Sequence, residues 1–210
     1  MVSEIVRMWQ GRFHLGNVGL IEPVEIELLH NLIIDPSLPY GHTLEIGTST
    51  GGTVYGMGQA NAMSNRNKNE IVMTVDPYPT ALPHHNDGWD VAARCVSSLA
   101  AIRRVPNTFF LHGTSATVRE LVNRPFFRII FIDGEHTPEA VLIDIQNTGP
   151  LLVKGGVMVL HDIANPAGEL ARPAWEHIIN NNGIDIKGGR LIPDPVTVGT
   201  SGKLRWGDAS

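Results

Sequence analysis

The chain has very little of what holds a small secreted protein together or carries a protein into a membrane. It contains one cysteine among 210 residues, so no disulfide framework can form within it. This residue, Cys95, lies in a helical pattern and is expected to be a small buried apolar side chain. No apolar run approaches the roughly 20 residues that span a bilayer, and the N-terminus lacks the basic and then apolar order of a secretory signal. These absences favour a cytoplasmic protein with no membrane partner.

Basic residues are also not in excess. Lys and Arg number 16 against 21 Asp and Glu, a net charge of -5, which leaves no basic face for nucleic acid. The 42% hydrophobic and 18% charged residues are typical of a globular protein. Residues 1–17 have no clear period and are predicted to be an N-terminal arm, and residues 18–210 are predicted to form one domain. Chemistry on small molecules is the expected class of function.

Short apolar runs alternate with helical patterns from residue 21 onward. Strands are expected at about 42–46, 71–75, 108–111, 128–132 and 157–160, and helices at about 21–34, 51–63, 91–102, 113–122, 138–149 and 171–181. Residues 184–192 and 196–205 are predicted to be a terminal pair of strands. Strands that alternate with helices predict an α/β fold, with a mostly parallel sheet covered on both faces.

The most informative stretch joins the first predicted strand to the following helix and reads Glu45-x-Gly47-x-x-x-Gly51-Gly52. Its glycines allow positive φ and let a ligand approach the backbone. The start of the next helix offers free N–H groups to a carboxylate or phosphate. A Walker loop would need Lys and Ser/Thr after the last glycine, where this chain has Thr53-Val54, and a dinucleotide fingerprint would need G-x-G-x-x-G. Neither motif fits this turn well.

Acidic residues come at or just after the ends of four predicted strands, on the edge where α/β sheets bind ligands. They are Glu45, Asp76, Asp133 and Asp162. Asp76 ends the second strand and suits the two hydroxyls of a ribose. If the fourth and fifth strands are neighbours, Asp133 and Asp162 lie on the order of 5 Å apart. Like charges at that distance repel unless they share a proton or a cation, and Mg²⁺ would suit two carboxylates and the hydroxyls of a substrate.

Histidines accompany these acids. His161 precedes Asp162 and is a softer ligand than a carboxylate, which opens the site to Mn²⁺, Fe²⁺ or Zn²⁺ as well. Further histidines lie in the loop after the second strand, at His84 and His85 beside Asp87. Their composition resembles a metal cluster, but we expect a solvated lid over the substrate.

The glycine turn resembles the first motif of class I S-adenosylmethionine-dependent methyltransferases. Phe131-Ile-Asp-Gly-Glu-His136 and Leu151-Leu-Val-Lys-Gly-Gly-Val-Met-Val-Leu-His-Asp162 are similar to the fourth and fifth strands of one branch, which contains macrocin-type sugar O-methyltransferases and cephalosporin hydroxylase-like domains. The resemblance spans about residues 40–165. It implies a seven-stranded sheet of order 3-2-1-4-5-7-6 with an antiparallel seventh strand.

The resemblance also implies site residues. Glu45 would help to hold the amino end of S-adenosylmethionine, and His136 would be the general base. The full set of predicted cofactor-binding residues is Glu45, Gly47, Thr48, Ser49, Gly51, Asp76, Thr114, Ser115 and Asp133; the predicted catalytic residues are Asp133, His136 and Asp162, and the predicted metal ligands are Asp133, His161 and Asp162. The chain departs from its relatives at Thr114-Ser115, where many carry an acid for the adenine amino group, and at His161, where the branch carries a further acid.

The expected function is therefore an O-methyltransferase that acts on a hydroxyl of a small polar metabolite such as a sugar, with S-adenosylmethionine as cofactor and Mg²⁺ or another divalent metal as an aid. The residues leave two alternatives open. The Asp/His cluster would also suit a metal-dependent oxygenase or hydrolase, and the glycine turn would also suit a module that binds a nucleoside without turnover. Whether the chain forms a homo-oligomer is left open by its sequence.

Overall fold

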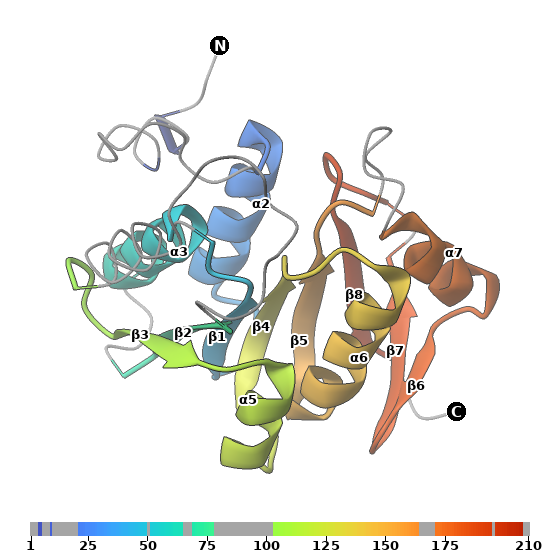
Figure 1. The fold of residues 1–210 in the computed structure, drawn as a ribbon. Helices are drawn as coiled ribbons and strands as arrows, with labels where there is room; N and C mark the ends of the chain where they lie inside the picture. The colour runs from blue at the N-terminus through green and yellow to red at the C-terminus, as the bar shows by residue number, and fades with distance from the viewer. Residues whose placement is uncertain are drawn as a thin grey trace, which may run out of the picture.

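The computed structural model describes residues 4, 5, 9, 21–49, 51–64, 69–77, 103–163, 171–194 and 196–207. These residues form one sheet with helices on both of its faces (Figure 1). Its strands are β1 (His42–Ile46), β2 (Val72–Asp76), β3 (Thr108–His112), β4 (Phe127–Ile132), β5 (Leu152–Leu160), β6 (Ile184–Ile186), β7 (Gly189–Pro193) and β8 (Gly202–Trp206). The strand order is β3-β2-β1-β4-β5-β8-β7-β6.

Strands β1 to β5 are parallel, and β8, β7 and β6 extend the sheet with antiparallel pairings. The predicted α/β fold is confirmed, as is an antiparallel strand beside β5. The predicted number of seven strands is wrong, because the sheet has eight. The run expected as one strand at 184–192 divides at Lys187-Gly188, where Gly188 takes a φ of +101° and the chain reverses into a hairpin.

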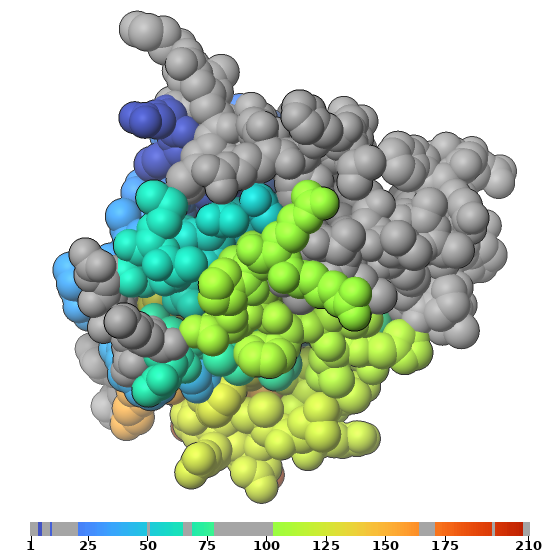
Figure 2. Space-filling view, turned by 90° about the vertical axis from the view of Figure 1, so that its left-hand side faces the viewer, coloured from blue at the N-terminus to red at the C-terminus, as the bar shows by residue number. Residues whose placement is uncertain are grey.

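Two layers of helices cover the sheet. Helices α2 (Pro23–Ile34) and α3 (Gly52–Met63) lie on one face, and α5 (Ser115–Leu121), α6 (Pro138–Thr148) and α7 (Arg172–Asn180) lie on the other (Figure 1). Strand β4 shows why both layers form. Its residues are all buried, and alternate side chains go to opposite faces: Ile129 and Phe131 pack with α2 and α3, while Ile130 and Ile132 pack with α5, α6 and α7. Seen from the side of the edge strand, residues of β3 lie between those of α3 and α5 (Figure 2).

Helix α2 is fixed at both ends. At its start, Pro23 occupies the first turn, and Glu22 and Glu25 form a reciprocal capping box. At its end, the fully buried Arg128 of β4 donates to the carbonyls of Leu32 and Ile33 over 3.2 and 2.8 Å. Helix α2 therefore has a set position against the sheet.

Several predicted features lie outside the described residues. They are the helix at 91–102 with Cys95, the loop with His84, His85 and Asp87, and most of the arm at 1–17. Within that arm, Trp9 is described and buried in the core, where its ring packs against Gly56 of α3. In the part of the chain that the structure describes, no helix is long and apolar enough to cross a membrane.

Candidate active site

The candidate site lies at the carboxyl end of the parallel strands, where backbone hydrogen bonds carry the sheet one residue beyond its strands. The amide of Gly47 donates to Val75 over 2.9 Å, that of Asp133 to Ile46 over 2.9 Å, and that of His161 to Ile132 over 3.0 Å. These backbone hydrogen bonds between neighbouring strands therefore hold the residues that follow β1, β4 and β5 at one edge of the sheet. This is the edge that the alternation of strands and helices predicted.

The glycine turn packs directly on the loop after β4. Gly47 has a φ of +93°, and a side chain there would collide with the backbone carbonyl of Asp133. Gly51 has a φ of +82° at the start of α3. Oδ2 of Asp76 accepts the backbone N–H groups of Thr48 and Ser49 over 2.8 and 3.2 Å. The acid that was predicted to bind ribose thus also holds the shape of the turn.

Glu45 lies beneath the turn and is fully buried. Its Oε2 accepts a hydrogen bond of 2.5 Å from Thr74, whose hydroxyl lies 2.6 Å from that of Thr48. Its Oε1 has no hydrogen-bond partner among the described residues. Burial, together with the charges of Asp133 and Asp76, raises the pKa of Glu45 well above its ordinary value, although the bond from Thr74 opposes this. A buried acid with an unsatisfied oxygen would gain from a cationic or N–H-bearing ligand.

Two imidazoles converge on Asp133. Nδ1 of His161 lies 2.7 Å from Oδ1 of Asp133, and Nε2 of His136 lies 3.3 Å from the same oxygen. The shorter contact is a buried ion pair when His161 is protonated. Burial opposes the charge of Asp133, but the two histidines outweigh it and lower its pKa.

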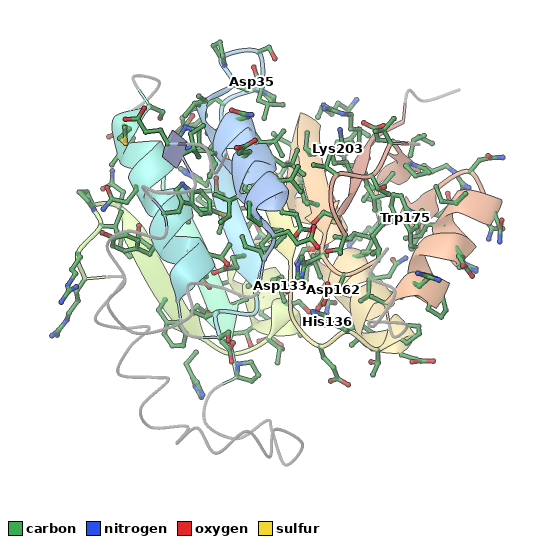
Figure 3. The ribbon with its side chains drawn as sticks, turned by 90° about the horizontal axis from the view of Figure 1, so that it is seen from above. Asp35, Asp133, His136, Asp162, Trp175 and Lys203 are labelled. Carbon is green, nitrogen blue, oxygen red and sulfur yellow. The ribbon has the colours of Figure 1, made fainter. Side chains whose placement is uncertain are left out.

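The other nitrogen of each imidazole faces a second carboxylate. Nδ1 of His136 lies 3.4 Å from Oδ2 of Asp162, and Nε2 of His161 lies 3.2 Å from Oε2 of Glu25. Asp162 has a φ of +56°, in the left-handed region, directly after His161. Asp133, His136 and Asp162 are seen side by side at the ends of the strands in Figure 3. A row of alternating acids and imidazoles thus runs from Glu25 through His161, Asp133 and His136 to Asp162, whose Oδ1 also lies 3.7 Å from Nε2 of His161.

Glu25 reaches this row from the first turn of α2. Its Oε1 accepts from the hydroxyls of Thr200 and Ser201 over 2.7 and 2.6 Å, and its Oε2 accepts from the backbone of Glu22 over 2.8 Å. Burial opposes the charge of Glu25, but His161 and Ser201 outweigh it and lower its pKa. Burial likewise opposes the charge of His161, but the contacts with Asp133 and Glu25 outweigh it and raise its pKa to about 10.

Thr114 and Ser115 follow β3 and differ in their surroundings. Thr114 is exposed and forms the N-cap of α5, in a capping box with Thr117. Ser115 is buried, and its hydroxyl accepts from Asn147 of α6 over 3.0 Å. Of this pair, Thr114 is thus the more accessible to a ligand.

The predicted metal ligands converge only in part. The residues whose ligand atoms lie within 4.8 Å of one another are Asp133, His136 and His161, so that His136 stands where Asp162 was expected. Sequence reasoning missed Glu25 altogether. Its signal was its position: Glu25 comes four residues after Ile21 and four before Leu29, on the apolar stripe of the predicted helix, where a charge needs a buried partner.

Comparisons with known proteins identify the family and the fold. A family model described as a methyltransferase domain matches residues 44–163. Among curated protein sequences, no match to the chain is found.

Solved structures share its fold. A Podospora anserina methyltransferase, PaMTH1, solved with SAH, has a TM-score of 0.63 at 16% sequence identity. The match covers 98% of this chain and 87% of the PaMTH1 chain. The Streptomyces achromogenes O-methyltransferase TomG, solved with SAM, has a TM-score of 0.60 at 16% identity and covers 98% and 91%. The calicheamicin methyltransferase CalS11 has a TM-score of 0.60 at 14% identity and covers 98% and 92%. At these identities the likeness to the three structures concerns the fold.

Proposed function

The chain belongs to the family of methyltransferase domains and is an S-adenosylmethionine-dependent methyltransferase, and we propose that it methylates a hydroxyl oxygen of a small polar metabolite. The observation that carries this proposal is the contact between Gly47 and Asp133. Because of this contact, the glycine turn packs against Asp133, which belongs to the row of acids and imidazoles. A methyl donor in the turn would thus lie beside groups that can receive a proton. Sugars are the leading acceptor class, because CalS11, which has this fold, is described as a TDP-rhamnose 3'-O-methyltransferase.

The residues of the turn fit S-adenosylmethionine. The unsatisfied Oε1 of Glu45 suits the ammonium group of the methionine part. Asp76 lies at the end of β2, where its carboxylate suits the ribose hydroxyls. Thr48, Ser49 and Gly51 form the backbone that the cofactor would lie against, and the exposed Thr114 would border the adenine.

Bound in this way, S-adenosylmethionine supplies a methyl group on a sulfonium centre. In this transfer the acceptor oxygen would take the methyl group, the electron pair of the carbon–sulfur bond would stay with sulfur, and the hydroxyl proton would pass to a group of the protein. The protein contributes mainly by aligning the acceptor and by receiving this proton.

His136 is the predicted base of the row, and its exposure supports this role. Its side chain is 31% exposed, whereas that of His161 is 3% exposed and held between two acids. Asp133 and Asp162 flank the two nitrogens of His136 and would stabilise the imidazolium that forms. A divalent cation held by this row would serve the same step by lowering the pKa of the hydroxyl.

The proposal is tested by calorimetric titration of the purified chain with S-adenosylmethionine. We expect binding, and we expect Asp76→Ala to weaken it by about 1.5 to 3 kcal/mol, because a charged acceptor is lost. The matched control is Asp185→Ala, whose carboxylate is 81% exposed and lies on β6. Equal affinity of the Asp76 variant and the parent would remove Asp76 from the cofactor site, and absence of binding would overturn the proposal. Acceptors can then be screened by following the formation of S-adenosylhomocysteine.

A further inference from the structure

We propose that the chain forms a two-fold symmetric dimer, in which helix α2 of each copy packs on the open half of the other copy's sheet. The open half is the surface formed by Asp185, Arg190, Ile192, Lys203 and Arg205 of β6, β7 and β8. It lies away from the row of acids and imidazoles, so this inference is independent of the proposed function.

The first argument is that one face of the terminal strands is left uncovered by the helices that the structure describes. Alternate residues of these strands pack into the core with α6 and α7: Ile184, Ile186, Leu191, Leu204 and Trp206. The residues between them therefore point to the opposite face, which is the face of α2. Figure 1 shows β8, β7 and β6 continuing the sheet to one side of α2, away from α3. The open half is thus the part of that face that α2 does not reach.

The second argument is that both surfaces expose apolar side chains. On the open half, Ile192 is 38% exposed. On the outer side of α2, Val24 and Ile34 are 42% and 39% exposed, and Leu28 between them is partly exposed. Positions 24, 28, 31 and 34 are spaced by three or four residues and so share one side of the helix. A groove at its C-terminal end is lined by Leu28, Asn31, Leu32, Ile34, Asp35 and Pro36. Each surface therefore offers the other apolar area to bury.

The third argument is the charge of the two surfaces. Helix α2 contains no Lys or Arg, and the acids on its outside and at its ends are Glu22, Glu27 and Asp35. The open half is rich in bases, although Asp185 pairs with Arg190 over 2.6 Å. Asp194, just after β7, pairs with Lys203 over 2.8 Å. The exposed Arg205 is the further base, and α2 of a second copy supplies the acid that it can pair with.

The fourth argument is that a single two-fold axis brings these groups together. A half-turn about an axis parallel to the strands places α2 of each copy over the open half of the other and keeps the same ends of the two sheets level. Helix α2 ends where Arg128 begins β4, since Arg128 donates to its last carbonyls. Arg205 lies near the same end, because it is in register with Val157, which is in register with Ile129. The axis therefore sets Asp35 of each copy near Arg205 of the other.

The dimensions of the two surfaces also agree. A helix of 12 residues is about 18 Å long and about 10 Å wide. Strands β7 and β8 have five residues each, about 17 Å, and two neighbouring strands are together about 10 Å wide. Because the interface is isologous, every contact between α2 and the open half occurs twice.

The experiment is sedimentation velocity of the full chain over a series of concentrations. We expect a reversible dimer. Arg205→Glu and Asp35→Lys should each raise the dissociation constant by at least about tenfold, because either change places two like charges together at both contacts. Circular dichroism establishes that each variant is folded.

A mixture of the two variants tests the symmetry. In a mixed dimer, one contact joins the introduced Glu to the introduced Lys, and the other joins the native Arg205 to the native Asp35. We therefore expect the mixture to dimerise about as tightly as the parent, although neither variant does so alone. Two independent contacts at unrelated surfaces would not give this rescue.

Matched controls are Arg119→Glu on α5 and Glu139→Lys on α6, which reverse the same charges on the opposite face of the sheet. They should leave the dissociation constant unchanged. A chain that stays monomeric at every concentration would overturn the proposal, as would a dimer that neither Arg205→Glu nor Asp35→Lys weakens. Failure of the mixture to dimerise would overturn the two-fold arrangement.

Discussion

Glu25 and His161 are 136 positions apart in the sequence, yet Oε2 of one lies 3.2 Å from Nε2 of the other in the protein interior. Glu25 comes from the start of α2, and His161 comes from the end of β5. The pair connects the helical layer on one face of the sheet to the edge where the candidate site lies.

The first prediction concerns the charge of His161. In the metal-free protein its pKa is raised from 6.5 to about 10, so the folded state binds a proton that the unfolded state releases near pH 6.5. This contribution to stability is complete below pH 6.5 and is lost as the pH rises through about 10. Denaturant unfolding in the presence of a chelator should therefore show stability falling between these values, by on the order of 3 kcal/mol.

Glu25→Gln should make this decline shallower, because the pKa of His161 falls when one of its two acids is neutralised. It should also lower the stability at pH 7 by about 2 to 4 kcal/mol. NMR of the imidazole nitrogens reports the titration directly, and Glu27→Gln is the control on the same helix. A His161 resonance that titrates near pH 6.5 in the parent would contradict this account.

Arg128 provides the second prediction. It is fully buried and donates to the carbonyls of Gly41, Leu32 and Ile33, and its guanidinium lies 3.0 Å from the carboxylate of Glu70. Arg128→Met removes the guanidinium that donates to these carbonyls and faces the acid, and should cost about 3 to 5 kcal/mol of unfolding free energy. The exposed Arg104, substituted in the same way, should change it by less than about 0.5 kcal/mol. Equal losses in the two variants would remove the special role of Arg128.

The third prediction compares two glycines with positive φ. Gly47 has a φ of +93° and Gly188 a φ of +101°, but a Cβ at Gly188 would meet no atom within 4 Å, whereas one at Gly47 would collide with the carbonyl of Asp133. Gly188→Ala should cost only the backbone strain, about 1 to 2 kcal/mol. Gly47→Ala should cost about 3 to 5 kcal/mol, because steric overlap adds to the strain.

Gly47→Ala should also weaken the binding of S-adenosylmethionine, since the turn and Asp133 must move apart. Thermal unfolding and calorimetry measure the two effects. If both variants lost the same stability and bound the cofactor equally, the contact with Asp133 would not be what requires a glycine at position 47.

Asp144 of α6 gives the fourth prediction. Burial and the charge of Glu135 raise its pKa from 3.8 to about 6, against the opposing bond from Ser115. The folded state thus holds a proton that the unfolded state has lost, and stability falls as the pH rises between these values. Asp144→Asn should therefore stabilise the protein at pH 8 by about 1 to 3 kcal/mol and give no gain at pH 3.5.

The control for Asp144 is Glu139→Gln, an exposed acid in the first turn of the same helix. It should change the stability by less than about 1 kcal/mol, with no step between pH 4 and pH 6. A gain of Asp144→Asn that is constant with pH would show that ionisation is not the cause.

Much of the fold could be predicted because local patterns carry it. Strands β1 and β4 are short and buried on both faces, and each is followed directly by a turn that begins with Gly47 or Asp133. Parallel pairing of Ile46 with Ile132, and of Ile132 with Leu160, then brings Gly47, Asp133 and His161 to one edge. The hairpin of β6 and β7 was missed because Lys187-Gly188 interrupts a run whose apolar alternation continues on both sides.

The contacts inside the site could not be predicted in the same way. We expected Asp133 and Asp162 to face one small volume, but the sequence did not show that His136 contacts both acids there, or that His161 contacts Asp133. The repulsion expected between the two acids is instead relieved by imidazoles. Such pairings depend on side-chain directions and on elements distant in sequence, which periodicity does not encode. For the same reason, the contact of Glu25 with His161 could not be predicted from the sequence.

The bonds from Thr200 to Glu25 join residues 175 positions apart and bear on how the chain matures during synthesis. A ribosome that adds about 5 to 20 residues per second would make residue 200 roughly 9 to 35 seconds after residue 25. Through that interval the acid of α2 lacks two of its hydroxyl donors, and in the last part of it Asp133 and His161 have already been made. Before its release, a nascent chain would therefore have most of its parallel sheet but not the completed site. Ribosome-bound chains that are stalled before and after Thr200 should differ in how well the start of α2 is protected from proteolysis.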